Sequence, residues 1–136
     1  MRVVIDTNVW LSALISLEAR KRLSIFIGNP EVEIFGTEVL LEELMEVIRR
    51  SKFRKYVTEI QAQDFLGLVK DRLDIISPKS NISICRDPND DFLLALCRDA
   101  EIDFLITGDK DLLILNPFEK TKIMTLSEFE NANPWA

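Results

Sequence analysis

Acidic side chains stand at four separated places in this 136-residue chain, each at the end of an expected strand or within an expected helix. The candidate positions are Asp6, Glu43, the run Asp87, Asp90 and Asp91, and the pair Asp109 and Asp111. Asp6 and Asp109 follow short apolar runs of the kind that form buried strands, where an ionised group is costly unless it is paired or bound to metal. The pattern therefore indicates a divalent-metal site.

The chemistry of such a site follows from its donor atoms. Converging carboxylates raise one another's pKa values unless a cation relieves their repulsion. Mg²⁺ and Mn²⁺ prefer hard oxygen ligands and retain bound water, so the site could polarise a phosphodiester and activate a water for attack. The chain contains no His, which excludes imidazole as a base or a metal ligand.

Each carboxylate also has a purely structural interpretation. Asp6 could cap the helix that follows it, and Glu43 could form a partly buried ion pair. On a helical wheel Glu43 points toward the core side of its helix, whereas Glu42 points toward solvent. Asp109 is the preferred ligand of its turn, and Asp111 is the alternative.

The acidic run requires a choice between neighbouring residues. Asp87 suits the N-cap of a helix that has Pro88 at its first position and Asp90 at its third, so capping and helix-dipole effects account for both acids. Asp91 lies one position further along and is less needed for capping. We therefore favour Asp91 as the ligand.

Basic residues are unevenly distributed in a chain whose formal net charge is −6, a charge that argues against broad adhesion to nucleic acid. The basic group comprises Arg49, Arg50, Lys52, Arg54 and Lys55. We expect this group to bind the phosphates of a nucleic acid, with the interleaved rings of Phe53 and Tyr56 available for base stacking. The alternative is a solvated helix end whose cations complement the helix dipole.

Length and composition predict one domain, residues 1–136, because a hydrophobic content of 47% suffices for an ordinary core. The sequence opens directly on an expected strand, and no apolar run approaches the roughly 20 residues needed to span a bilayer. We therefore expect a cytoplasmic protein without a membrane partner. Cys85 and Cys97 are expected to be small buried side chains rather than parts of a disulfide or zinc site.

The elements that must position the carboxylates alternate between strand and helix. Strands are predicted at residues 3–5, 32–35, 74–77, 104–106 and 122–124, and helices at 9–27 with a break at 16–18, 37–50, 58–72, from 87 onward, at 109–113 and near 127–130. This alternation predicts an α/β fold, a three-layer α/β/α sandwich around a central parallel sheet of about five strands. Ligands of such sheets lie beyond the carboxyl ends of the strands, where Asp6 and Asp109 are expected.

Capping patterns predict where three of the helices begin. Thr37 suits the N-cap of the helix that carries Glu43. The pairs Thr58 with Gln61 and Ser127 with Glu130 have the spacing of capping boxes.

Four short segments, taken together and in order, resemble one protein family. They are Val-Val-Ile-Asp-Thr-Asn, Glu-Leu-Met-Glu-Val-Ile, Asp-Pro-Asn-Asp-Asp-Phe-Leu-Leu-Ala-Leu and Phe-Leu-Ile-Thr-Gly-Asp-Lys-Asp-Leu-Leu. Over essentially the whole chain they are similar to the PIN-domain family of small metal-dependent ribonucleases, which includes the toxins of VapC-type toxin–antitoxin pairs.

The resemblance implies a set of functional expectations. It implies Mg²⁺ or Mn²⁺ and an RNA substrate, frequent homodimers, and a small antitoxin protein as a partner. The acidic ligands carried over are Asp6, Glu43, Asp91 and Asp109, with Asn8 and Thr107 as polar supports of the site. Because the third segment has the form Asp-Pro-x-Asp-Asp, either Asp90 or Asp91 could face the metal.

Two other functions compete with a metal-dependent ribonuclease. A phosphoacceptor receiver domain needs a second acid beside Asp6, where this chain has Thr7 and Asn8. A non-catalytic PIN-like module that binds RNA or protein is the stronger alternative. RNA cleavage with and without metal separates it from a nuclease.

Overall fold

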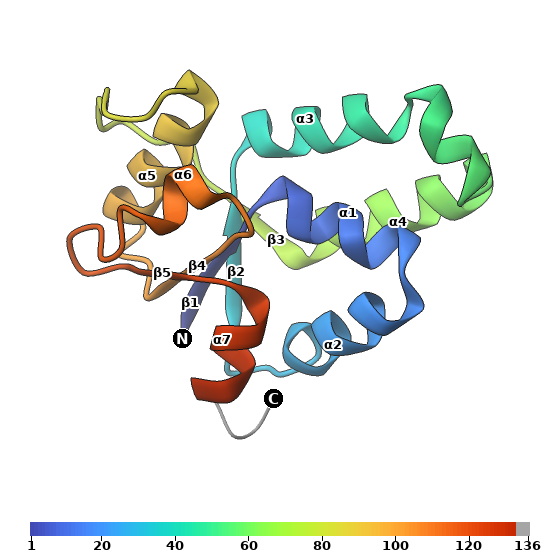
Figure 1. Cartoon of the computed structure of the whole chain (residues 1–136), viewed down its shortest axis with the longest axis horizontal. Helices are drawn as coiled ribbons and strands as arrows, with labels where there is room; N and C mark the ends of the chain where they lie inside the picture. The colour runs from blue at the N-terminus through green and yellow to red at the C-terminus, as the bar shows by residue number, and fades with distance from the viewer. Residues whose placement is uncertain (133–136) are drawn as a thin grey trace.

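The computed structural model describes residues 1–132 and contains a five-stranded parallel sheet (Figure 1). The strands are β1 (Arg2–Ile5), β2 (Glu33–Gly36), β3 (Leu73–Ile75), β4 (Phe104–Ile106) and β5 (Lys122–Met124). Their order across the sheet is β3-β2-β1-β4-β5, and every neighbouring pair is parallel. The predicted α/β class with about five parallel strands is confirmed.

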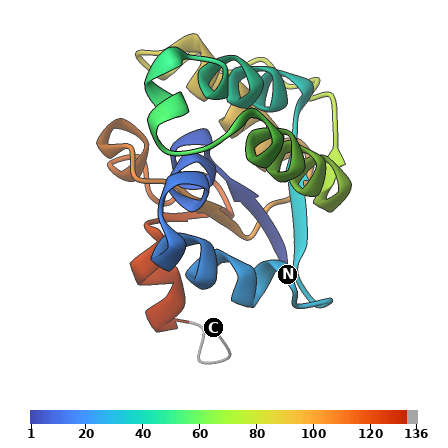
Figure 2. The same ribbon diagram turned by 90° about the vertical axis from the view of Figure 1, so that its right-hand side faces the viewer.

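Helices cover both faces of the sheet. They are α1 (Thr7–Ile15), α2 (Leu17–Ile27), α3 (Glu38–Ile48), the 3-10 helix η1 (Ser51–Lys55), α4 (Glu59–Arg72), α5 (Pro88–Asp99), α6 (Lys110–Leu113) and α7 (Leu126–Ala132). Figure 1 shows α1 to α4 on one side of the sheet and α5 on the other, and Figure 2 views the molecule from the side of α1 to α4. The helices and the sheet therefore form the predicted three layers.

The burial pattern explains why the central elements are apolar along their whole length. Val3, Val4 and Ile5 of β1 have no exposed surface, because β1 has helices over both faces and strands at both edges. Helix α5 likewise buries five consecutive residues, Leu93 to Cys97. A continuous apolar strand and an apolar helix thus both mark the middle of the molecule.

The order of the strands creates a crevice next to β1. The chain passes from β1 through α1 and α2 to β2, and then through α3 and α4 to β3, so it moves steadily toward one edge. After β3 it returns past β2 and β1 to form β4 and then β5. Ligands of open parallel sheets lie where this direction reverses, beyond the carboxyl ends of the strands. Asp6 and Thr107, which follow β1 and β4, stand at that point.

Several predicted helix boundaries are confirmed. The predicted break at 16–18 is present, since α1 ends at Ile15 and α2 begins at Leu17. Thr37 caps α3 by accepting the Leu40 N–H at 3.0 Å. The predicted capping box at the start of α4 is also present.

Other boundaries differ from the prediction. The capping box of α7 joins Thr125 and Glu128, and the predicted box at Ser127 and Glu130 is wrong because the Glu130 carboxylate instead binds Arg22 at 2.7 Å. Strand β3 covers 73–75 rather than 74–77. The last residues of the predicted domain, 133–136, lie outside the described residues. Within the described ones, no helix has the length and apolar character needed to cross a membrane.

Candidate active site

Asp6 lies at the junction between β1 and α1, where its backbone is extended and its Oδ1 accepts the Thr7 N–H at 2.7 Å. The side chain is 8% exposed. Burial raises the pKa of this carboxyl, the Thr107 hydrogen bond opposes the rise, and the charges of Asp109 and Asp87 add to it. Asp6 is therefore both the helix cap and a buried carboxylate near other acids.

Thr107 connects the loops that follow β1 and β4. Its hydroxyl donates to Asp6 Oδ2 at 2.8 Å and accepts the Asp109 N–H at 3.0 Å. Asp109 in turn caps α6, because its Oδ1 accepts the Asp111 N–H at 2.9 Å. One buried hydroxyl thus fixes the Asp6 carboxylate and the backbone at Asp109.

Glu43 reaches the same place from α3. The helix buries Leu40 and Leu44 against the core, which leaves Glu43 half-buried beside a narrow cavity of 10 Å³ that Asp6 and Asp90 also line. Burial raises the pKa of Glu43, and the Asp6 charge raises it further. Glu42 is exposed, in agreement with the helical wheel.

The structure corrects the preference for Asp91 over Asp90. The Asp91 carboxylate accepts the N–H groups of Ile84 and Cys85 at 3.1 and 2.9 Å. Asp91 is therefore hydrogen-bonded to the loop before α5. Asp90 instead lines the cavity with Asp6 and Glu43. Burial and then the charge of Asp6, followed by those of Asp109, Asp87 and Glu43, raise the pKa of Asp90 to about 7.

The spacing of apolar residues along α5 carries a sequence signal for Asp90. Asp90 is three, four and seven positions before Leu93, Leu94 and Cys97, all of which are buried, whereas Arg98, seven positions after Asp91, is exposed. Residues at these spacings share a helix face. Asp90 therefore lies on the core side of α5.

Asp87 is a further acidic neighbour that the sequence argument assigned to capping alone. Its Oδ1 does cap α5 by accepting the Asn89 N–H at 3.0 Å. Its charge also raises the pKa values of Asp6, Glu43 and Asp90. Asp87 can do both because the carboxylate that caps α5 lies at the start of that helix, close enough to act on Asp6 and Asp90.

The other two supporting positions behave differently from each other. Asn8 is exposed and its Oδ1 accepts the Gly108 N–H at 3.4 Å, which adds a second, longer link between the loops after β1 and β4. Asp111 is also exposed, and its Oδ2 lies 3.8 Å from Nη1 of Arg86. The charge of Asp109 raises the pKa values of Asp6 and Asp90, and the choice of Asp109 over Asp111 as a metal ligand stays a prediction.

The donor set fits a hydrated divalent cation. Asp6, Glu43, Asp90 and Asp109, the acidic cluster, form no ion pair with a Lys or Arg of residues 1–132. Over the same residues no three acidic or thiol side chains converge into a set that could hold a metal directly. Mg²⁺ needs no such cage, because it keeps several waters and is held by one or two carboxylates. The hard oxygen donors, which form no ion pair within residues 1–132, therefore suit Mg²⁺ or Mn²⁺ with retained water.

The basic group lies at the far end of α3. Arg49 ends the helix, η1 carries Lys52, Arg54 and Lys55, and all five cations of the group are exposed. Figure 1 shows α3 and α4 running out from the sheet and joined there by η1. A rise of 1.5 Å per residue puts Arg50 about 10 Å along the axis from Glu43. The group is thus within a few nucleotides' reach of the acidic cluster.

The two aromatic side chains of this segment differ in exposure. Phe53 is buried, and Nζ of Lys52 lies 5.4 Å from its ring centroid. The expectation that Phe53 stacks on bases is therefore wrong, since its ring anchors η1. Tyr56 is exposed and stays available.

An acidic crevice beyond β1 and β4 of a five-stranded parallel sheet agrees with the family indicated by the four segments. The family model described as PIN domain matches residues 2–111. The chain therefore belongs to the PIN domain family.

Three individual proteins are similar to this chain. Uncharacterized protein MJ1680 of Methanocaldococcus jannaschii is 30% identical over 122 residues, which are 88% of this chain and 78% of that protein. The crystal structure of VapBC2 from Rickettsia felis, bound to a promoter DNA fragment, matches with a TM-score of 0.60 at 17% identity, covering 90% of this chain and 98% of that chain. The PIN domain endonuclease Utp24 gives a TM-score of 0.46 at 18% identity, covering 82% and 73%. The likeness to VapBC2 confirms a VapC-like fold.

Proposed function

We propose that this protein is an endoribonuclease that hydrolyses RNA phosphodiester bonds with Mg²⁺ or Mn²⁺. The observation that carries the proposal is the acidic cluster: its four carboxylates lie around the switch point of a PIN-domain sheet, and none of them forms an ion pair with a cation of residues 1–132. A divalent ion would relieve their repulsion. When bound, it would supply polarisation of the phosphodiester and an activated water.

Each residue of the cluster has a distinct task in this proposal. Asp6 is the principal metal ligand, because it is the most buried of the carboxylates and Thr107 fixes its orientation at 2.8 Å. Glu43 and Asp90 approach from opposite sides of the crevice and would bind through retained water or directly. Asp109, tied to the Thr107 hydroxyl through its N–H, completes the set.

The protonation of Asp90 depends on whether a metal is bound. In the metal-free protein its pKa is about 7, so the carboxyl is partly protonated near neutral pH. Metal binding would lower this value by opposite charge. We infer that Asp90 binds the metal or its water as the ionised form in the loaded enzyme.

The proposed RNA path leads from the cluster to the basic group. Arg54 and Lys55 are exposed and form no ion pair within the described part of the chain. Cations that are not already paired gain most from contacting phosphates, since counterion release drives such binding. A positively charged helix end beside an acidic pocket therefore fits a substrate held by its backbone and cut at a metal.

A toxin role is supported by a surface suited to a protein partner. A groove of 410 Å³ runs between α1, α2 and α4, lined by Trp10, Leu23, Phe65 and Leu68 among others. Leu68 is 70% exposed. An exposed leucine beside an apolar groove suits contact with the apolar face of a helix. We propose that an amphipathic helix of an antitoxin fills this groove.

The second candidate function is a PIN-like module that binds RNA or protein without cutting it. The two functions differ in one measurable property, metal-dependent turnover. A homodimer and a cytoplasmic location stay predictions of the sequence.

The deciding experiment measures cleavage of defined RNAs by the purified chain with Mg²⁺, with Mn²⁺ and with chelator. The proposal requires cleavage that depends on the metal and is lost in Asp6→Asn, a nearly isosteric change that removes one charge. RNA binding without cleavage under all conditions would establish the non-catalytic module instead.

A further inference from the structure

A second cavity adjoins the acidic cluster on the other side of the Asp6–Thr107 pair. It has a volume of 430 Å³, within the range of about 300–1,000 Å³ typical of small-molecule sites. Its walls come from the loops after β4 and β5 and from α1, α2 and α7, and its polar lining residues are Asn8, Ser12, Arg22, Thr107, Thr125 and Ser127. Thr107 lines this cavity and also donates a hydrogen bond to Asp6. The cavity therefore lies next to the Asp6 carboxylate.

Apart from Arg22, the polar residues that line this cavity are uncharged, and they lie among the apolar side chains of Val9, Ala19 and Leu126. Asn8 is exposed, and its side-chain amide makes one long contact of 3.4 Å through Oδ1, to Gly108, so its Nδ2 donors are available among the described residues. Ser12 and Ser127 are exposed hydroxyls on facing helices. Amides and hydroxyls read the polar edges of unstacked bases, whereas a phosphate site needs cations.

The guanidinium of Arg22 forms a flat part of the cavity wall, and its charge is balanced by Glu130. Its Nε donates to Glu130 at 2.7 Å and its Nη2 donates to Ser127 at 2.9 Å, which fixes the guanidinium between α2 and α7. The Glu130 carboxylate neutralises the charge, so this group has little attraction for a phosphate. A held guanidinium plane is, however, a surface on which bases stack.

We propose that this cavity binds the base and ribose of one unpaired RNA nucleotide next to the cleaved phosphate. The inference rests on the proposed ribonuclease function and deepens it: the acidic cluster would hold the phosphate, the basic group the strand on one side, and this cavity the nucleoside on the other. The enzyme would then require an unstacked nucleotide at the cut, and Asn8 would contact its base edge.

The test combines changes in the RNA with changes in the cavity. Two single-stranded RNAs are compared, one intact and one with an abasic ribose beside the cleaved phosphate, prepared for each side in turn. Wild-type kcat/KM should fall on the order of tenfold for one of the two abasic positions. Ser12→Leu and Ser127→Leu, which fill the cavity from opposite walls, should lower cleavage of the intact RNA and remove most of this difference.

The matched control is Ser24→Leu on α2. Like Ser12, Ser24 is an exposed helical serine whose Oγ donates to a carbonyl of the preceding turn, 2.8 Å for Ser24 and 3.0 Å for Ser12. It does not line the cavity. Ser24→Leu should keep the full abasic effect, and thermal melting checks that all three variants are folded.

The outcomes separate the cavity from the proposed function. Metal-dependent cleavage that is equal for intact and abasic RNAs overturns the nucleotide site and leaves the ribonuclease standing. If no cleavage occurs, the proposed function fails. Fluorescence anisotropy then measures the binding of the same RNAs and shows whether the cavity binds a nucleotide. Tighter binding of intact RNA that Ser12→Leu abolishes supports the site, and equal binding overturns it.

Discussion

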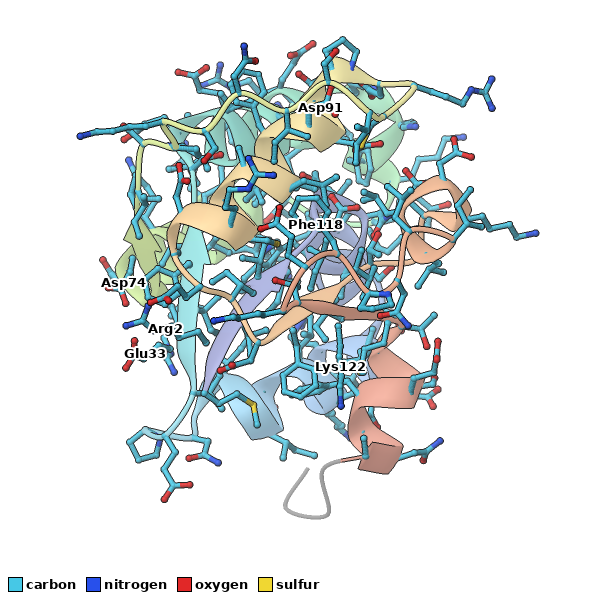
Figure 3. All side chains as sticks on the ribbon, turned by 90° about the vertical axis from the view of Figure 1, so that its left-hand side faces the viewer. Arg2, Glu33, Asp74, Asp91, Phe118 and Lys122 are labelled. Carbon is cyan, nitrogen blue, oxygen red and sulfur yellow. The ribbon has the colours of Figure 1, made fainter. Side chains whose placement is uncertain are left out.

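Asp90 and Asp91 are neighbours in the sequence, yet their carboxylates lie in opposite surroundings. Burial and the charges of Asp6, Asp109, Asp87 and Glu43 raise the pKa of Asp90 to about 7. The pKa of Asp91 is lowered, first by the N–H of Cys85 and also by that of Ile84. Figure 3 shows Asp91 at the end of the molecule where α5 begins, well apart from Arg2 and Lys122 at the starts of β1 and β5. The Asp90 carboxylate therefore lies among other acids without a neutralising cation, whereas the Asp91 carboxylate accepts two backbone N–H groups.

This difference predicts opposite effects for two matched substitutions. Asp90→Asn should raise the melting temperature of the metal-free protein, because it removes one of several mutually repelling charges, and should weaken the stabilisation by Mn²⁺. Asp91→Asn should lower the metal-free melting temperature, since the loop N–H groups lose a charged acceptor, and should leave the Mn²⁺ effect intact. Thermal melts with and without Mn²⁺ measure both. If Asp91→Asn instead weakened the stabilisation by Mn²⁺ and Asp90→Asn left it intact, Asp91 would be the ligand.

The metal-free protein should become less stable as the pH rises from 5 to 8. The native pKa of Asp90 is about 7, above its ordinary 3.8, so the native state binds more protons than the unfolded state in this window and stability falls with pH. Asp6 and Glu43, whose pKa values are also raised, act in the same direction. We expect the melting temperature to fall by roughly 3–5 °C, the shift that about 1 kcal/mol produces in a domain of this size.

Two controls accompany the pH series. Asp90→Asn should flatten the dependence, and saturating Mg²⁺ should oppose it because the metal favours the ionised carboxylates. The groups with lowered pKa values, Asp91, Asp99 and Glu119, contribute only in more acidic solution. A melting temperature that rises between pH 5 and 8 would argue against a crowded acidic crevice.

The sequence predicted the fold better than the details of the site because the two depend on different information. Continuous apolar runs at β1 and β4 and the caps at Thr37 and Asp87 are local features, and they fix strands, helix starts and hence the sheet edge. Which of Asp90 and Asp91 faces the crevice depends on the rotation of α5 about its axis. That rotation is set by how α5 packs on the sheet, and in the sequence it is indicated only by the spacing of Asp90 from Leu93, Leu94 and Cys97, a weaker signal than the cap at Asp87.

Long-range pairs were the other features that could not be predicted. The box expected at Ser127 and Glu130 has the correct local spacing, but Arg22, 108 residues before Glu130, binds that carboxylate. Nothing local to either residue indicates the other. The cavity proposed as a nucleotide site depends on this pair and was likewise invisible in the sequence.

The Thr107 hydroxyl should be needed for both stability and chemistry. Thr107→Val removes the donor to Asp6 and the acceptor of the Asp109 N–H from a fully buried position, so we expect a loss of about 1–3 kcal/mol in the free energy of unfolding. Since this hydrogen bond lowers the pKa of Asp6, the acid limb of the cleavage–pH profile should move to higher pH. Thr107→Ser keeps the hydroxyl and should restore the profile. An unchanged profile in Thr107→Val would mean that the hydroxyl is only structural.

The basic group should act on RNA through its phosphates. Arg54→Gln with Lys55→Gln should weaken RNA binding and reduce the slope of log affinity against log salt by about 1.4, or 0.7 for each single-strand phosphate that a cation no longer neutralises. Lys120→Gln with Lys122→Gln is the matched control, because these exposed lysines lie at β5, the opposite edge of the sheet from β3. Equal slopes for both double variants would mean that the basic group does not contact RNA and is only a solvated helix end.

The last prediction concerns inhibition by an antitoxin, which we expect to use two surfaces of this chain. An Arg or Lys of the partner would enter the acidic crevice, where carboxylates without a cation attract it, and an apolar helix would fill the groove beside α4. Leu68→Asp places a charge in that groove and should weaken antitoxin binding by about tenfold or more. Ile60→Asp is the control, since Ile60 is 73% exposed on the same helix and does not line the groove.

Competition with metal distinguishes the two surfaces. If a partner cation occupies the crevice, excess Mn²⁺ should weaken inhibition, and the antitoxin should protect Asp6 and Asp109 from line broadening by Mn²⁺ in NMR spectra. Leu68→Asp should lower affinity at every Mn²⁺ concentration without changing this competition, because the groove and the crevice are separate sites. Inhibition that is indifferent to Mn²⁺ but still sensitive to Leu68→Asp would instead mean that the partner covers the RNA path near Arg49 and Lys55 and leaves the crevice open.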